Sequence, residues 1–373
     1  MKPLADILVV SLEQAVAAPF CSVRLADAGA RVIKIERIEG DFARFYDKDV
    51  KGESANFVWL NRGKESLAAD IKDKEDQLLI QKIISSADVY IQNLAPGAAE
   101  RAKLGSKDLR AINNRLITCD ISGYGQTGSY SQRKAYDLLV QAESGLCSVT
   151  GNPDNPGRVG VSVCDIACGL NAHSAILQAL LVREKTGKGC GIEISLFDGM
   201  ADWMNVPYLQ TVYGGRSIKR VGLSHPSIAP YGAFTSSCGT KILISIQNER
   251  EWKKLCISVL KLKSLADNNK FNEPTKRVSN RKDLDNIVAK EFIKYDKNHL
   301  IDRLSKSKIA FGVLNEIKDL ETHPQLRKIK CKIGDEEIEL IAPPEMSLNQ
   351  VQTMTKVPKI GENTIEIKKE FSF

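Results

Sequence analysis

Residues 157–170 read GRVGVSVCDIACGL, a valine-rich run followed at once by small residues. The run at 159–163 predicts a buried strand, and the pattern over 166–181 predicts a helix. Asp165 would then lie where a strand passes into a helix, and there unpaired backbone N–H groups and the helix dipole favour negative charge. Open α/β sheets bind ligands at this edge. The residues alone leave two roles open for Asp165, that of a helix cap and that of a chemical group.

The composition is that of an ordinary globular protein. The chain has 373 residues, 43% of them hydrophobic and 27% charged, which is enough for two domains. Its 53 basic and 46 acidic residues give a net charge of +7, a mild excess that suits a small polyanionic ligand. Because no basic stripe is interleaved with aromatic residues, nucleic acid is not an expected partner.

The cysteines indicate a reduced compartment. All nine are scattered, several within apolar runs, which is not the pattern of a disulfide framework. Cys164 and Cys168 lack the second pair or nearby His of a zinc site, so no metal is expected. The sequence shows no signal-peptide pattern and no apolar run close to the ~20 residues that span a bilayer. We therefore expect a cytoplasmic protein without a membrane partner.

The first two hundred residues alternate between strand-like and helix-like patterns. This alternation predicts a large Rossmann-like α/β domain, with a parallel sheet covered on both faces. The first turn, residues 13–19, lacks the GxGxxG fingerprint, so a nicotinamide dinucleotide site is not expected. The expected strands are 7–12, 31–35, 65–71, 87–92, 116–122 and 191–195, and the expected helices are 17–28, 74–85, 107–113 and 136–146.

The pattern changes after about residue 200. A strand pair is expected at 231–234 and 241–246, and helices at 249–260 and 283–305, the latter capped by Asp283. A further strand is expected at 336–341. The expected organisation is a large domain, a linker, a smaller α+β domain and a C-terminal segment that returns to the large domain, with the boundaries 1–200, 201–224, 225–320 and 321–373.

A series of motifs from residue 5 to about 363 resembles the class III CoA-transferase family. This superfamily includes formyl-CoA and dicarboxylate CoA-transferases and the α-methylacyl-CoA racemases. The resemblance implies that the large domain binds CoA and that two ring-like subunits interlock in a homodimer. The motifs are LADAGARVIKIER (25–37), NLAPGAAERAKLG (93–105), GYGQTGSYSQRKAYD (123–137), ESGLCSVTG (143–151), VSVCDIACG (161–169), KTGKGCGIEISLFDGM (185–200) and HPSIAPYGAF (225–234).

The resemblance also implies roles for individual residues. The catalytic aspartate of the family falls on Asp165, which favours the chemical role over the cap. Gln14 and His225 are candidate contacts of the second substrate. Arg and Lys suit the phosphates of CoA, and CoA is expected as a substrate rather than as a bound cofactor. The implied CoA contacts are Val16, Ala17, Arg37, Ala69, Lys72, Asn93, Leu94, Ala95, Arg101, Lys134 and Tyr136.

The expected reaction moves CoA between an acyl-CoA and a small carboxylic acid. A free Asp has a pKa of ~3.9, so Asp165 is expected to be anionic at neutral pH without a general base. Its carboxylate would attack the thioester carbonyl and form an aspartyl–acyl anhydride. Backbone N–H groups at the start of the following helix are expected to stabilise the oxyanion.

Two alternatives stay open. The racemases share the fold and the aspartate but carry His at the position of Tyr136, and a Tyr with a pKa near ~10 is a poor base for an α-proton. The other alternative is a non-catalytic CoA-binding protein in which Asp165 is only a cap. Residues 221–232 lack the glycine run of the formyl-CoA members, which favours larger dicarboxylic or hydroxy acids. The chain ends soon after 361–363, where relatives continue into a helix, and this leaves the packing of the tail in the dimer open.

Overall fold

Residues 2–344 and 354–373 are described by a computed structural model, and their contacts group the chain into two units. Unit 1 comprises Met1–Cys147, Arg158–Arg216 and Arg327–Phe373. Unit 2 comprises Ser148–Gly157 and Ser217–Leu326. The domain boundaries expected from the sequence stay a prediction beside this grouping.

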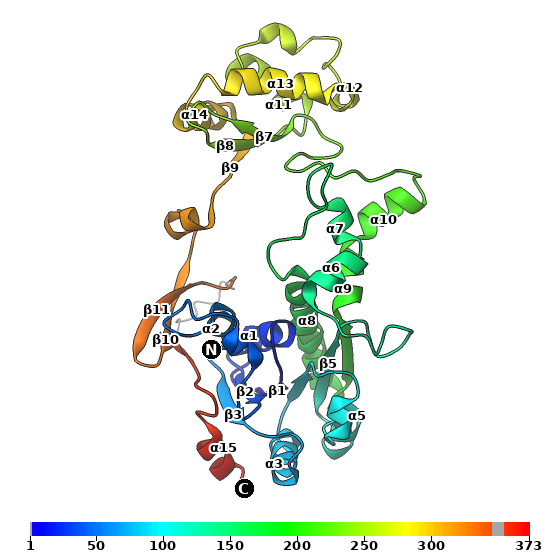
Figure 1. The fold of residues 1–373 in the computed structure, drawn as a ribbon, viewed down its shortest axis with the longest axis vertical. Helices are drawn as coiled ribbons and strands as arrows, with labels where there is room; N and C mark the ends of the chain where they lie inside the picture. The colour runs from blue at the N-terminus through cyan, green and yellow to red at the C-terminus, as the bar shows by residue number, and fades with distance from the viewer. Residues whose placement is uncertain (1, 345–353) are drawn as a thin grey trace. The chain divides into compact units, whose positions relative to one another are not determined.

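Unit 1 is built on a six-stranded parallel sheet, as the strand–helix alternation predicts (Figure 1). The strand order is β3-β2-β1-β4-β5-β6, so the chain leaves β1 first toward one edge and later toward the other. The carboxyl ends of β1 and its neighbours therefore form the switch point at which such sheets bind ligands. The strands are β1(Leu8–Leu12), β2(Arg31–Glu36), β3(Glu65–Ala68), β4(Val89–Gln92), β5(Ile117–Ser122) and β6(Gly191–Ser195).

Helices cover both faces of this sheet because alternate strand residues point to opposite sides. Val9, Val89 and Ile117 pack with α1 and α8 on one face, and Val10, Ile33 and their neighbours pack with α3 on the other. Figure 1 shows α1 and α8 next to one another. The helices of this unit are α1(Ala17–Asp27), α2(Ala55–Asn61), α3(Lys74–Ser85), α4(Ala98–Arg101), α5(Ser106–Ile112), α6(Asp137–Glu143), α8(Val163–Thr186), α9(Leu196–Trp203) and α10(Asn205–Val212), with the 3₁₀ turn η1(Phe42–Phe45).

The valine-rich run at 159–163 is not a strand, and that prediction is wrong. The Gln141 side chain of α6 takes the place of a neighbouring strand, accepting the Val159 N–H at 2.9 Å and donating to the Val159 carbonyl. α8 begins at Val163, so Asp165 lies in the first helical turn and not at a strand end. By length and composition α8 is also apolar enough to cross a membrane, and 33% of its apolar window is buried within the structure.

The C-terminal part of unit 1 adds a second, small sheet and a final helix. β10(Lys328–Ile333) pairs antiparallel with β11(Glu336–Ile341) and parallel with β12(Thr355–Val357). The last helix, α15(Thr364–Glu370), is anchored beside β3, where Asn363 Oδ1 accepts the Ser66 N–H at 3.0 Å. The chain therefore continues into a short helix after residues 361–363.

Unit 2 contains an antiparallel sheet of order β7-β8-β9, formed by β7(Tyr231–Thr235), β8(Lys241–Ser245) and β9(Ala310–Val313). Its core surrounds the fully buried Trp252 and Phe292. The strand pair is confirmed, but the single helix predicted at 283–305 is wrong. The remaining helical elements are α11(Glu249–Lys254), the π-helix η2(Leu255–Val259), η3(Lys263–Leu265), α12(Pro274–Ser279), α13(Arg281–Phe292), α14(Lys297–Ser307) and η4(Ile317–Thr322).

Helix capping explains that error. Asp296 accepts the His299 N–H at 2.8 Å and starts α14 as a new helix, so the helical conformation is interrupted at 293–296. Asp283 is not a cap, since α13 begins two residues earlier and its N-cap is Asn280. In unit 1 the helix predicted at 136–146 similarly ends at Glu143, and α7(Leu146–Val149) follows separately.

Candidate active site

Asp137, and not Asp165, caps the N-terminus of α8. Asp137 Oδ1 accepts the N–H groups of Cys164 at 2.7 Å and Asp165 at 3.3 Å, while Gln141 donates to Oδ2 at 2.7 Å. The carboxyl group of Asp165 has no hydrogen-bond partner within 2–344 and 354–373. The capping role left open by the sequence is therefore already filled, and the Asp165 carboxyl is available for chemistry.

The environment of Asp165 makes its carboxyl hard to ionise. Burial is the larger cause and the nearby Asp137 carboxylate the smaller, and together they raise the pKa of Asp165 to about 7. At neutral pH roughly half of the unliganded chains would carry a neutral Asp165. The expectation of a fully anionic nucleophile, which rested on the free-acid pKa, does not hold in this environment.

The N–H groups at the start of α8 are not free to bind an oxyanion. Val163 and Ile166 donate to the carbonyls of Val161 and Ser162, at 2.8 and 2.9 Å, and Asp137 takes the two N–H groups between them. The oxyanion donors expected there are therefore already used. This correction follows from the Asp137 cap, which the sequence pattern does not reveal.

The start of α1 lies against the same part of α8. Ile166 packs on Val16 and Phe20. A Cβ atom on Gly169 would lie 2.6 Å from the carbonyl oxygen of Ala17, so the two helices approach here at backbone distance. The N–H groups of Ala17 and Ala18 donate to no acceptor in the part of the chain that the structure describes, as is usual in a first helical turn.

A cavity of about 510 Å³ opens at the carboxyl ends of the first strands. Arg37 and Lys72 lie at its exposed rim and form no ion pair among the described residues. Two unpaired cations beside this cavity suit a ligand that carries several phosphates. Of the residues named from the sequence, the cavity lining contains Gln14, Arg37, Ala69, Lys72, Leu94 and Ala95.

The other sequence-named residues lie elsewhere. Val16 and Ala17 are buried at the start of α1, and Asn93 acts on the backbone, holding Gln14 through hydrogen bonds of 2.9 and 2.8 Å. Arg101 and Lys134 are exposed outside the cavity. Tyr136 is 65% exposed and precedes α6. The structure therefore gathers part of the predicted set at one edge of the sheet.

His225 belongs to unit 2 and is described within it. Its ring stacks on Tyr231 with centroids 5.2 Å apart, and its Nδ1 accepts the Ser227 N–H at 3.1 Å. Arg281 of α13 donates to the His225 carbonyl at 2.6 Å. These contacts hold the loop in one conformation and leave Nε2 of the ring without a described partner.

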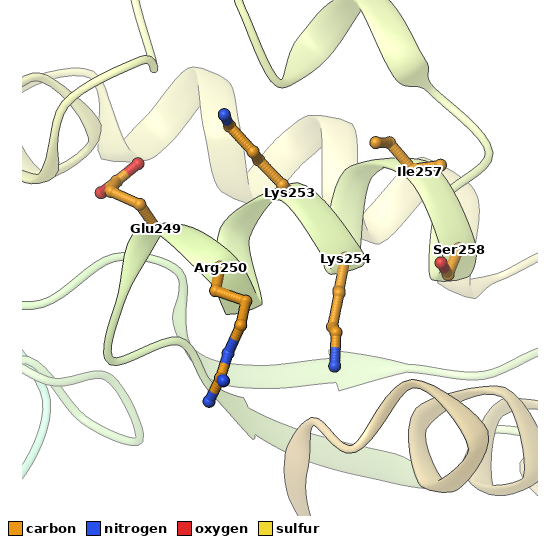
Figure 2. Close-up of a pocket in the computed structure, with 6 residues that line it drawn as sticks. All are labelled: Glu249, Arg250, Lys253, Lys254, Ile257 and Ser258. Carbon is orange, nitrogen blue, oxygen red and sulfur yellow. The ribbon is translucent and has the colours of Figure 1, made fainter.

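A hollow in unit 2 has no comparable pair of cations facing one ligand. Figure 2 shows its lining on α11 and η2, with Lys253 projecting away from Arg250 and Lys254. Because these cations diverge, they do not surround one ligand. Among residues 2–344 and 354–373, no group of three or more His, Cys, Asp or Glu side chains is placed to hold a metal ion.

Sequence reasoning missed two features beside the predicted site. Tyr46 follows η1, and its pKa is raised to about 12 by burial and by the charges of Asp41 and Asp165. Below the first turn, Glu13, Lys34, Asp41 and Lys64 form a buried ion-pair network. The only signal for this network was a lysine within the apolar run of 31–36.

The chain is similar to known proteins over most of its length. A family model described as CoA-transferase family III matches residues 4–364. Succinyl-CoA:glutarate CoA-transferase of Homo sapiens is 35% identical over 87% of this chain and 75% of its own length. Acetyl-CoA:oxalate CoA-transferase of Acetobacter aceti is 32% identical over 99% of this chain and 96% of its own. A crystal structure of a CAIB/BAIF family protein from Brucella suis has a TM-score of 0.88 and 33% identity, covering 99% of both chains.

Proposed function

The chain is an enzyme of CoA-transferase family III, and we propose that it moves CoA from an acyl-CoA to a small dicarboxylic or hydroxy acid through an anhydride on Asp165. One observation carries the proposal for this residue. Asp137 satisfies the N-terminal N–H groups of α8, so the Asp165 carboxyl has no structural hydrogen bond to make. A partly buried carboxyl without a partner lowers the stability of the fold, and such groups are concentrated at functional sites.

The proposed first step is nucleophilic substitution at the thioester. An Asp165 carboxylate oxygen bonds to the acyl carbon, the C–S bond breaks, and CoA leaves as the thiolate. The CoA thiolate then attacks the Asp165 carbonyl carbon of the anhydride, which releases the donor acid and leaves an aspartyl–CoA thioester. The acceptor carboxylate attacks this thioester, which forms a second anhydride and releases CoA thiolate again. The thiolate attacks the acceptor's carbonyl carbon, which forms the new acyl-CoA and returns the Asp165 carboxylate. Because anhydrides hydrolyse, the partial burial that raises the pKa of Asp165 also protects the intermediate from water.

Two cations at the rim of the cavity support CoA as the substrate. The phosphates of CoA are strong anions, and Arg37 and Lys72 are unpaired cations among the described residues. Lys134 and Arg101 are further exposed cations in unit 1 for the same ligand. CoA is proposed as a substrate, with no permanently bound cofactor.

The relatives support a dicarboxylic acceptor. The human relative is named for succinyl-CoA and glutarate, and the Acetobacter relative for acetyl-CoA and oxalate. Residues 221–232 lack a glycine run, and His225 keeps a free ring nitrogen within its loop. We propose His225 and Gln14 as contacts of the acceptor acid.

A cytoplasmic homodimer completes the proposal. Apolar side chains are exposed along α9 and α10, among them Trp203, Val206, Leu209 and Tyr213. A second copy would remove this surface from water. All nine cysteine thiols are free, which suits a reducing compartment.

The test is a screen of purified enzyme with succinyl-CoA and acetyl-CoA against small mono- and dicarboxylic acids, oxalate included. The expected result is new acyl-CoA formed only with dicarboxylic or hydroxy acids, and lost in Asp165→Ala. A folded Asp165→Ala enzyme with full activity would exclude the proposed nucleophile. Donor acyl-CoA alone in deuterated water separates the racemase, which exchanges the α-proton, from a transferase, which does not. Binding of CoA without turnover of any acid would favour the non-catalytic alternative.

A further inference from the structure

The turn between β1 and α1 holds a conformation that its sequence does not favour. Ala15 has a φ of 63°, in the left-handed region where a side chain is strained. The residue next to it, Gln14, lines the cavity, and the chain continues directly into the start of α1 beside α8. Other contacts must therefore hold the turn in place.

Asp41 supplies the contact at the strained residue. Its Oδ1 accepts the Ala15 N–H at 3.2 Å and the Ala43 N–H at 2.9 Å, the latter as the cap of η1. Its own N–H donates to Glu36 Oε2 at 2.9 Å. One carboxylate thereby ties the turn of β1–α1 to the loop after β2.

The position of Asp41 is fixed by a buried lysine. Lys34 Nζ lies 2.9 Å from Asp41 Oδ2, 3.6 Å from Glu13 Oε1 and 3.4 Å from the Glu13 carbonyl oxygen. Lys64 neutralises Glu13 at 2.6 Å, and the side chains of all four residues are inaccessible to solvent or nearly so. Two lysines therefore balance two carboxylates beneath the turn.

Stability alone does not explain this ion-pair network. Apolar residues of similar volume generally stabilise a core as well as a buried ion pair does, whereas losing one partner leaves an unpaired buried charge. What the ions add is fixed geometry, because Lys34 reaches both the residue before the turn and the carboxylate that holds Ala15. Glu13 and Asp41 also form part of the cavity wall.

We propose that Asp41, held by Lys34, is a positioning residue of the transfer reaction. It keeps the Gln14–Ala15 turn, and with it the start of α1, in register with the Asp165 segment of α8. This inference rests on the proposed function. Asp41 touches the backbone of the turn and acts on the reaction only through it.

The test compares Asp41→Ala with Asp41→Ala/Ala15→Gly. Without its acceptor the strained turn relaxes, and kcat/KM for the donor acyl-CoA is expected to fall at least about 100-fold, mainly in kcat. Glycine adopts a positive φ without strain, so adding Ala15→Gly should restore about five- to tenfold of the loss, the factor that corresponds to ~1–1.4 kcal/mol. Loss of the buried ion pair lowers the melting temperature, and Asp41→Ala/Ala15→Gly should not recover the melting temperature of the natural enzyme.

Asp88→Asn is the matched control. Asp88 also accepts a backbone N–H, that of Leu8 at 2.8 Å, and pairs with Arg183 at 2.9 Å, but it directly precedes β4 and so lies at the amino ends of the strands, away from the cavity. This variant should lose stability and keep kcat/KM within about twofold. Should Asp41→Ala not fold, Asp41→Asn keeps the volume and an Oδ1 acceptor for the Ala15 N–H, and it removes the charge by which Lys34 fixes that side chain.

Hydrogen exchange of the peptide 13–17 gives a readout independent of turnover. Faster exchange at Ala15 is expected in both Asp41→Ala variants and, to a smaller extent, in Asp41→Asn, where only the hold of Lys34 is lost. It is not expected in Asp88→Asn. A folded Asp41→Ala enzyme with natural exchange and natural kcat/KM overturns the inference, as does an activity loss that follows stability alone and is unaffected by Ala15→Gly. If the natural enzyme transfers CoA to no acid, the proposed function fails, and the exchange result still decides whether Asp41 holds the turn.

Discussion

The most informative perturbation of this site is Asp137→Asn, which removes a charge beside Asp165 and keeps the helix cap. Asn caps helices about as well as Asp, and its Oδ1 can still accept the N–H groups of Cys164 and Asp165. Burial, the larger cause of the raised pKa of Asp165, is unchanged in the variant. The pKa of Asp165 should therefore fall from about 7 and remain above about 5.4, midway to its ordinary value.

The size of the effect follows from this bound. At pH 6 about one tenth of Asp165 is ionised in the natural enzyme, and lowering its pKa by one unit raises that fraction to about one half. The first half-reaction at pH 6 should then accelerate up to about fivefold, while its rate at pH 9 changes little. The diagnostic quantity is the midpoint of the pH profile, which should move to lower pH.

In the assay, enzyme is mixed rapidly with donor acyl-CoA between pH 5 and pH 9, and the reaction is monitored by the loss of thioester absorbance. Asp73→Asn is the control, because Asp73 caps α3 through the N–H groups of Glu75 and Asp76 and lies away from Asp165. An unchanged or higher midpoint in folded Asp137→Asn would refute the account of the pKa, as would an equal shift in the control.

Three further outcomes are expected. Asp165→Asn should stabilise the fold at pH 8 by up to about 4 kcal/mol and not at pH 3. The reason is that a raised pKa of Asp165 in the folded state lowers the free energy of unfolding of the natural enzyme as the pH rises from about 4 to 7. Equal denaturation midpoints of the two enzymes at pH 8 would contradict this. Arg37→Ala/Lys72→Ala should raise KM for acyl-CoA about tenfold or more and weaken its salt dependence, with a truncated pantetheine thioester as the unaffected control. Gly169→Ala should cost about 1–3 kcal/mol in urea unfolding, since its Cβ would meet the Ala17 carbonyl at 2.6 Å, and a neutral change would show that this helix contact is not close.

The sheet of unit 1 was predictable because its signal is local. Apolar runs of four to six residues alternate with helical patterns, and α3(Lys74–Ser85) begins at a capping Asp73 whose side chain accepts two N–H groups. The strands β1, β2 and β4 are buried on both faces, so their composition reports their environment directly. The turn 13–19 likewise lacks the glycines of a dinucleotide site, and the cavity there is bordered by charged side chains.

The failures around Asp165 occur where side chains distant in sequence replace backbone partners. The run at 159–163 has the composition of a strand, yet the Gln141 side chain bonds the backbone of Val159, and no strand pairs with the run among the described residues. Asp137 lies 28 residues before Asp165, and the sequence does not show that it caps α8. The sequence therefore indicates neither the raised pKa of Asp165 nor that the N–H groups at the start of α8 are already used. Lys34 within β2 was visible, but its partners Glu13 and Asp41 become apparent only in three dimensions.

The most direct test of the central claim is a trapping experiment on the first half-reaction, before the acceptor acid is added. Enzyme is mixed with donor acyl-CoA without acceptor acid, quenched with hydroxylamine and digested, and the peptide that contains Asp165 is examined by mass spectrometry. A hydroxamate on Asp165, dependent on the donor and absent from Asp165→Asn, is the predicted result. A turnover-competent enzyme whose Asp165 stays unmodified, with the label on another carboxyl or on none, would contradict the account.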